Sequence, residues 1–134
     1  MRLRALVLIA VAWFAGAAVA ADPPHRVFEI RTYTTPEGKL DALNKRFREH
    51  TMEIFERHGM VNIGYWMPQD PPLAGHTLIY ILAHKSREAA KRSWDEFGKD
   101  PEWQKVRADS EANGPIVTKV ESVFVEATDY SPLK

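Results

Sequence analysis

The feature that most constrains this chain is the run VFEIRTYTTPEGKL at residues 27–40, where a strand pattern gives way to a helix pattern. Side chains alternate with a period of two as far as Tyr33, which predicts a strand with two chemically different faces. Thr35 and Pro36 then predict a helix start, because threonine caps free amide groups and proline suits the first turn. The sequence therefore predicts that the fold begins as a strand followed at once by a helix.

The predicted helix ends near Gly59, which suits a left-handed cap, and the basic residues Arg57 and His58 before it complement the helix dipole. Polar residues at the other positions, Arg46 among them, are predicted to form its solvated face. The apolar residues recur at helical spacing and predict one buried stripe: Leu40, Leu43, Phe47, Ile54 and Phe55.

Three further strands and two further helices are predicted downstream. The strands are expected at residues 60–67, 77–84 and 116–125, and the helices begin at the capping residues Ser86 and Asp100. The order β-α-β-β-α-α-β predicts an α+β fold. We expect a ferredoxin-like, four-stranded antiparallel sheet with its helices on one face.

Four fragments of the chain, VFEIRTYTTPEGKLDAL, ERHGM, GYW and DPEW, occur in an order and spacing that resemble the NIPSNAP family. The resemblance covers about residues 26–125. It implies membership of the dimeric α/β-barrel superfamily, in which two ferredoxin-like protomers pair their sheets. That superfamily includes cofactor-free monooxygenases, haem-degrading enzymes and lactone isomerases. The resemblance implies no particular catalytic residues.

Residues 1–21 read as a signal peptide. Two arginines precede an apolar run, and a small-x-small triplet supplies a cleavage site near Ala20 and Ala21. Cleavage there predicts a secreted or periplasmic protein with one NIPSNAP-like domain at residues 22–134 and no membrane attachment. The alternative is a retained anchor, because the apolar run of 17 residues lies at the short limit of a membrane span.

Charge and cysteine content exclude several classes of function. The chain has 18 basic and 18 acidic residues, and loss of Arg2 and Arg4 with the signal leaves a net charge of −2 with histidine neutral. No basic surface for a phosphate backbone is expected, so nucleic acid is not a predicted partner. The absence of cysteine excludes disulfides, thiol nucleophiles and zinc–thiolate sites.

The helix-free face of the predicted sheet mixes aromatic and charged side chains. Such a face suits either water or a polar-edged subunit interface. The family resemblance favours the interface and therefore a face-to-face homodimer. The residues predicted on this face are Glu29, Arg31, Tyr33, Asn62, Trp66, Lys119 and Glu121.

Arg31 and Tyr33 are candidate catalytic and ligand-binding residues. An arginine can hold an anionic group and a tyrosine can donate a proton or a hydrogen bond. The alternative, which the residues favour, is an ion pair of Arg31 with Glu29 or Glu121 at the dimer contact, with Tyr33 as an anchor.

His50 lies between Phe47 and Ile54 in the apolar stripe and is therefore predicted to face the sheet. There it is a candidate base or haem ligand, with a hydrogen bond to a nearby carbonyl as the ordinary alternative. His84, at the end of a strand, is a second candidate ligand for haem. The histidine spacings match no metal motif, so no metal site is predicted.

Three tryptophans, Trp66, Trp94 and Trp103, are many large rings for one domain. Trp94 and Trp103 are predicted to pack in the core. Trp66 suits a dimer contact and a flat aromatic ligand equally well.

Three functional hypotheses follow. The preferred one is an exported homodimeric domain that binds a small hydrophobic or aromatic molecule or a protein partner. The second is a cofactor-free monooxygenase or isomerase that uses Arg31, Tyr33 and His50 around an apolar pocket. The third is a haem-binding protein.

Overall fold

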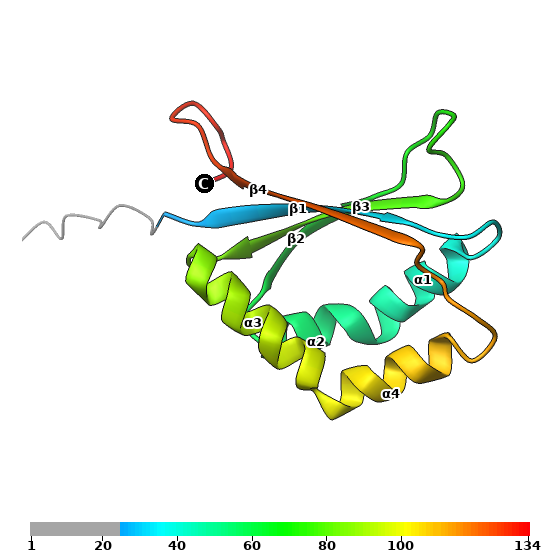
Figure 1. Ribbon diagram of the computed structural model, residues 1–134. Coiled ribbons are helices and arrows are strands. Elements are labelled where there is room, and N and C mark those ends of the chain that lie inside the picture. Colours follow the sequence, from blue (N-terminus) through cyan, green and yellow to red (C-terminus); the bar gives the residue numbers. More distant parts are fainter. Residues whose placement is uncertain (1–24) are drawn as a thin grey trace, which may run out of the picture.

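The structure, a computed structural model, describes residues 25–134. A sheet forms one layer, and the helices lie together on one side of it (Figure 1). The predicted signal peptide falls outside the described residues. Across residues 25–134, no helix is long and apolar enough to cross a membrane. In chain order the elements are β1 (Val27–Thr34), α1 (Leu40–Arg46), the π-helix η1 (Phe47–Thr51), α2 (Met52–Arg57), β2 (Val61–Trp66), β3 (Thr77–His84), α3 (Arg87–Lys99), α4 (Pro101–Ser110) and β4 (Lys119–Glu126).

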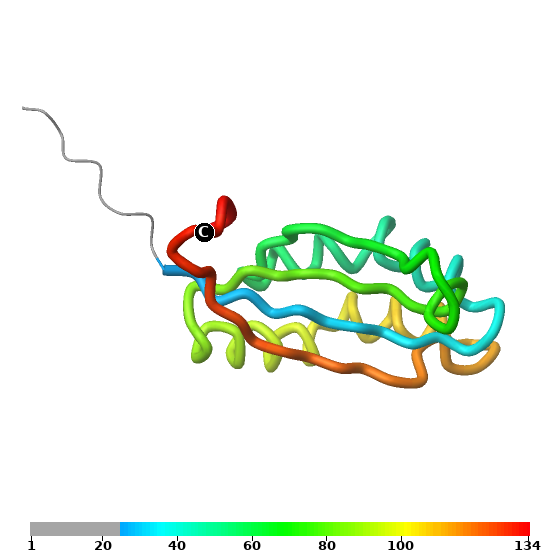
Figure 2. The backbone as a smooth tube through the Cα atoms, turned by 90° about the horizontal axis from the view of Figure 1, so that it is seen from above, coloured from blue at the N-terminus to red at the C-terminus, as the bar shows by residue number. Residues whose placement is uncertain are grey.

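The sheet is antiparallel with the strand order β2-β3-β1-β4, so the first and third strands form its centre (Figure 2). β1 pairs along its whole length with both neighbours, and Arg31 lies opposite Tyr80 of β3 and Ser122 of β4. The predicted element order and the ferredoxin-like α+β class are confirmed.

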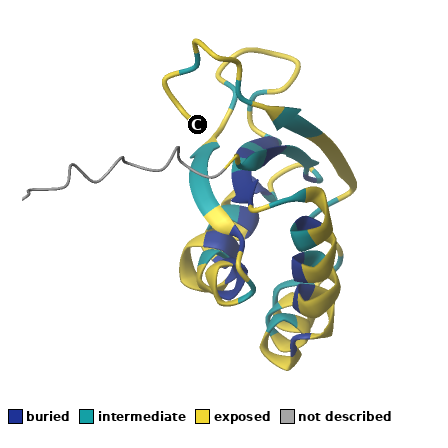
Figure 3. Cartoon of the chain, turned by 90° about the vertical axis from the view of Figure 1, so that its left-hand side faces the viewer, coloured by how far each residue is buried: buried dark blue, intermediate teal, exposed yellow. Residues whose placement is uncertain are grey.

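The core lies between the sheet and the helices, where the buried residues gather (Figure 3). Tyr80 of β3 is at its centre, with its ring centroid 5.1 Å from that of Phe47 and 5.2 Å from that of Tyr65. Each fully buried side chain of this size contributes roughly 1.5–3 kcal/mol relative to exposure. The predicted stripe is confirmed, since all of its members are buried: Leu40, Leu43, Phe47, Ile54 and Phe55.

The start of the first helix was wrongly predicted. α1 begins at Leu40, and the Thr35 hydroxyl donates to the His76 carbonyl at 3.3 Å instead of capping the helix. Gly38 explains the delay, because its φ of +73° belongs to a turn and not to a right-handed helix. The other caps match the prediction: Ser86 Oγ and Asp100 Oδ1 each accept backbone amides of the helix that follows.

The two faces of β1 are the reverse of the prediction. Glu29, Arg31 and Tyr33 lie beneath the helices, and the Arg31 guanidinium stands 4.1 Å from the centre of the Trp94 ring of α3. Alternation separated the two sets of side chains correctly. It could not say which set is covered, because hydrogen bonds from α3, β3 and β4 make the polar set the buried one.

β2 is irregular, which corrects a second placement. A register shift between Asn62 and Gly64 turns Asn62 towards the helices, where its Nδ2 donates to the Met52 carbonyl at 3.0 Å. Trp66 stays on the helix-free side, as predicted, and lies over Gly64. A Cβ atom added to Gly64 would come within 2.5 Å of the Trp66 ring.

The helix-free side of the sheet, called the open face below, is largely apolar. Val123 is 59% exposed and Trp66 is 52% exposed. The β2–β3 loop and the C-terminal tail both rise on this side (Figure 1), and Leu133 of the tail shares a small cavity with Phe28. By strand alternation and register the open face carries Phe28, Ile30, Thr32, Trp66, Ile79, Ile81, Lys119, Glu121, Val123 and Val125.

Candidate functional site

A buried carboxylate lies at the centre of the polar cluster beneath the sheet. Glu29 of β1 is 1% exposed and accepts four side-chain hydrogen bonds. The donors are Arg31 Nη1 at 2.6 Å, Trp94 Nε1 and Ser122 Oγ at 2.8 Å, and His84 Nε2 at 2.9 Å. Burial alone would raise the pKa of Glu29, but these donors outweigh it and lower the pKa to about 2. Glu29 is therefore an anion at neutral pH.

The pairing of three strands and one helix brings these donors together. Arg31 follows Glu29 on the same face of β1, and Ser122 of β4 is the direct partner of Arg31 in the ladder. His84 ends β3, beside the start of β1. Trp94 lies on the face of α3 that packs against Phe55 of the core, with ring centroids 5.3 Å apart.

Arg31 is fixed in place by this cluster. Its guanidinium stacks on the Trp94 ring, and its Nη2 donates to the Tyr33 hydroxyl at 3.3 Å. The Nε of Arg31 is buried and has no hydrogen-bond partner among the described residues. An immobilised guanidinium that lines a cavity can bind an oxygen anion or a carbonyl oxygen.

Two cavities lie on either side of the contact between Arg31 and Trp94. One, of about 620 Å³, separates α3 from β1 and β4 and is called the α3 cavity. The other, of about 350 Å³, extends to α4 and is called the α4 cavity. Arg31 and Trp94 line both and separate one from the other, and the two neighbouring cavities near β4 are together called the groove. Its other lining residues are Glu29, Arg87, Glu88, Lys91, Asp95, Ser122 and Phe124 in the α3 cavity, and Tyr33, Arg46, Phe97, Trp103, Arg107, Glu111, Val117, Thr118, Lys119 and Val120 in the α4 cavity.

The groove offers aromatic walls and cationic groups together. In the α4 cavity, Arg31, Arg46 and Arg107 face one carboxylate, that of Glu111. Such a combination suits a flat molecule that carries an acidic or carbonyl oxygen. Among residues 25–134, no three histidine, aspartate or glutamate side chains are grouped as metal ligands.

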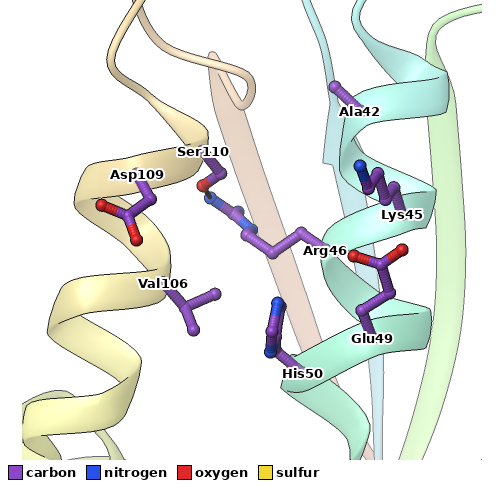
Figure 4. Close-up of a pocket in the computed structure, with 8 residues that line it drawn as sticks. All are labelled: Ala42, Lys45, Arg46, Glu49, His50, Val106, Asp109 and Ser110. Carbon is purple, nitrogen blue, oxygen red and sulfur yellow. Dashed lines mark hydrogen bonds between the residues drawn. The ribbon is translucent and has the colours of Figure 1, made fainter.

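His50 lies outside the groove, contrary to the prediction that it faces the sheet. The π-helical turn η1 changes the rotation of the chain after Arg46, so that His50 is exposed. His50 lines a separate cavity of about 280 Å³ between the first helical segment and α4 (Figure 4). Arg46 crosses this gap towards α4, and its Nη1 donates to Ser110 Oγ at 3.1 Å.

Of the five predicted site residues, the structure brings three together. Arg31, Tyr33 and His84 belong to one hydrogen-bonded and stacked cluster, whereas His50 and Trp66 lie elsewhere. The ring of His84 is fully buried and its Nε2 is paired with Glu29, so haem has no access to that nitrogen.

The central role of Glu29 was not predicted. The sequence shows only that a carboxylate lies in the middle of a strand whose other residues could be buried. Trp94 was predicted as core alone, and it also donates to Glu29. Arg46 was predicted to be solvated, but it is buried in contact with Ser110, Glu111 and Trp103 of the region of α4.

The sequence matches the NIPSNAP family model over residues 28–132. The comparison with curated proteins gave no match. Among solved structures, a NIPSNAP family protein of Agrobacterium tumefaciens is 22% identical, with a TM-score of 0.73 over 87% of this chain and 97% of that one.

Two oxygenases have similar structures. A monooxygenase of Streptomyces coelicolor, solved with nanaomycin D, is 16% identical, with a TM-score of 0.58 over 87% of this chain and 100% of that one. The cofactor-independent oxygenase SnoaB of Streptomyces nogalater is 13% identical, with a TM-score of 0.54 over 81% of this chain and 98% of that one. Such identities indicate a common fold alone. The family match spans most of the sequence, and the chain belongs to the NIPSNAP family.

Proposed function

We propose that this protein binds a flat aromatic small molecule bearing an acidic or carbonyl oxygen, and that it does so in the groove beneath the sheet. The observation that carries the proposal is the Arg31 guanidinium, which is stacked on Trp94 between two cavities and has an unpaired buried Nε. The ligand oxygen accepts a hydrogen bond from Arg31, and its ring lies against the aromatic wall.

Preorganisation supports this assignment. Glu29 holds Arg31 at 2.6 Å and is itself held by three other donors, so binding needs little ordering of the arginine. The groove volumes of about 620 and 350 Å³ lie in the range of small-molecule sites.

We further propose that the protein acts as a homodimer and is exported. The open face supports the dimer, because an apolar sheet face that exposes Val123 and Trp66 is unfavourable in water. A second copy of this face would cover it. The signal-like residues 1–21 support a secreted or periplasmic location.

A second candidate function is cofactor-free oxygenation of the bound molecule. Similarity to the two oxygenases supports it at the level of fold, and Tyr33 supplies a hydroxyl beside Arg31. An electron-rich substrate would itself supply the electrons that reduce oxygen. Oxygen uptake with 1-naphthol, lost in Tyr33→Phe, is the expected result. The absence of uptake would leave binding as the function.

Calorimetric titration with 2-naphthoate tests the binding proposal. We expect saturable binding that weakens at least about tenfold in Arg31→Gln, since a hydrogen bond to a charged group contributes about 1.5–3 kcal/mol. Arg48→Gln removes an exposed cation outside the groove and should bind as the original protein does. Because Arg31→Gln also leaves Glu29 without one partner, Trp94→Phe provides a second test, and it should weaken binding while the protein stays folded. Unchanged affinity in both groove variants would refute the proposal.

A further inference from the structure

A second buried guanidinium lies at the far end of the α4 cavity. Arg46 is 5% exposed and lies 5.0 Å from the centre of the Trp103 ring. Its Nη1 donates to Ser110 and to Glu111 at 3.1 and 3.3 Å. Its Nε is buried and has no hydrogen-bond partner among the described residues.

Arg46 and Arg31 share the same environment. Each stacks on a tryptophan, each contacts one carboxylate, and each keeps a buried Nε without a partner. Both line the α4 cavity. Two guanidinium groups that line one cavity favour an occupant with two acceptor groups, because each can form a charge-assisted hydrogen bond.

Aromatic rings connect the two arginines. Trp94 and Phe97 have ring centroids 5.5 Å apart, and Phe97 and Trp103 have centroids 4.5 Å apart. Arg31 stands at the Trp94 end of this wall and Arg46 at the Trp103 end. A small inorganic anion would bind to one guanidinium and would not contact the aromatic rings between the two arginines.

The charge of the cavity favours an anion at the Arg46 end. Glu111 is the carboxylate partner of Arg46, and it is shared with Arg107, whose Nε lies 3.4 Å away. Burial lowers the pKa of Arg46, and Glu111 offsets this only in part. An arginine stays protonated even so, and the cation is therefore incompletely compensated.

We propose that the ligand of the α4 cavity is a flat aromatic molecule with two acidic groups at opposite ends, one held by Arg31 and the other by Arg46. This inference rests on the proposed binding function and names its ligand class. Arg46 is the specificity-determining residue, because it binds the second acidic group, which a monoacid lacks.

Titration calorimetry with 2-naphthoate and naphthalene-2,6-dicarboxylate compares one acid group with two on the same ring system. The intact protein should bind the diacid at least about tenfold more tightly than the monoacid, the factor expected for one charge-assisted hydrogen bond. Arg46→Gln should abolish this preference, so that the two compounds bind with similar affinity. Arg48→Gln, two positions along the chain and exposed, should keep the preference.

The outcomes separate this inference from the function on which it rests. If neither compound binds, the proposed function fails. If both compounds bind with equal affinity, or if Arg46→Gln weakens the binding of both equally, the proposed binding function is supported and the preference for two acidic groups is refuted.

A second readout covers the case in which Arg46→Gln fails to fold. In the intact protein, the indole N–H signal of Trp103 in a nitrogen–proton spectrum should shift more with the diacid than with the monoacid. Equal shifts with the two compounds would overturn the inference.

Discussion

The two faces of the sheet contrast in an unusual way. The face beneath the helices carries an ion pair, a buried histidine and three tyrosines, whereas the face with no helix carries mostly isoleucine, valine and phenylalanine. A sheet with one solvated face is ordinarily apolar towards the helices and polar towards water. This contrast supports the proposals that the covered face binds a ligand and that the open face packs against a second copy of the chain.

The largest effect is expected where the covered face is most polar. Glu29→Gln removes the anion that compensates Arg31, and a broken buried ion pair costs about 3–5 kcal/mol of unfolding free energy. Urea unfolding measures this change. Glu121→Gln is the matched control on the open face, and it should stay within about 0.5 kcal/mol. Equal losses in the two variants would contradict the contrast between the faces.

Acid should lower the unfolding free energy by protonating the same carboxylate. The pKa of Glu29 is lowered from 4.5 to about 2 in the folded protein, so its stabilisation is present above about pH 4.5 and is lost as the pH falls towards 2. The lost free energy of unfolding is at most about 3 kcal/mol. Denaturant unfolding at a series of pH values tests this. In Glu29→Gln, the decrease in unfolding free energy between about pH 4.5 and pH 2 should be smaller by that amount. The same decrease in the variant and in the original protein would exclude Glu29 as its source.

Association should depend on the open face alone. Val123→Asp places a charge where a second copy would pack, and we expect dimerisation to weaken about 100-fold, equivalent to about 2.7 kcal/mol. Val120→Asp is its control, because Val120 lies on the same strand with similar exposure but on the covered side. Sedimentation velocity reads the outcome. A protein that is monomeric before any substitution would refute the proposed dimer.

The smallest effect is expected at Gly64. Alanine there would bring a Cβ within 2.5 Å of the Trp66 ring, which is half exposed and can swing away. We expect a change in unfolding free energy of no more than about 1 kcal/mol and a shift in tryptophan emission. Gly98→Ala, with open space around it, should leave the emission unchanged.

The elements were predictable because local chemistry determines them. Ser86 and Asp100 cap their helices as predicted, and the strand at residues 77–84 has the predicted bounds. The covered face of β1 was not predictable, because its two sets of side chains are about equally able to pack. Only the donors that converge on Glu29 from β3, β4 and α3 decide between them.

The remaining errors come from single inserted residues. The irregular register at Asn62 turns that side chain towards the helices, and the π-helical turn exposes His50. Neither feature leaves a pattern in the sequence, since each depends on tertiary packing that overrides the local period. Arg31 and Tyr33 were predicted as site residues but were placed on the wrong side of the sheet, because alternation alone does not determine which face of β1 is covered.

Indole nuclear magnetic resonance tests the central claim most directly, because Trp94 reports on the groove and Trp66 on the open face. The indole N–H of Trp94, which donates to Glu29 at 2.8 Å, should shift progressively as 2-naphthoate is added, while that of Trp66 stays in place. Trp94→Phe and Trp66→Phe assign the two signals. A shift of Trp66 with Trp94 unmoved would put the ligand on the open face and contradict the groove as the binding site.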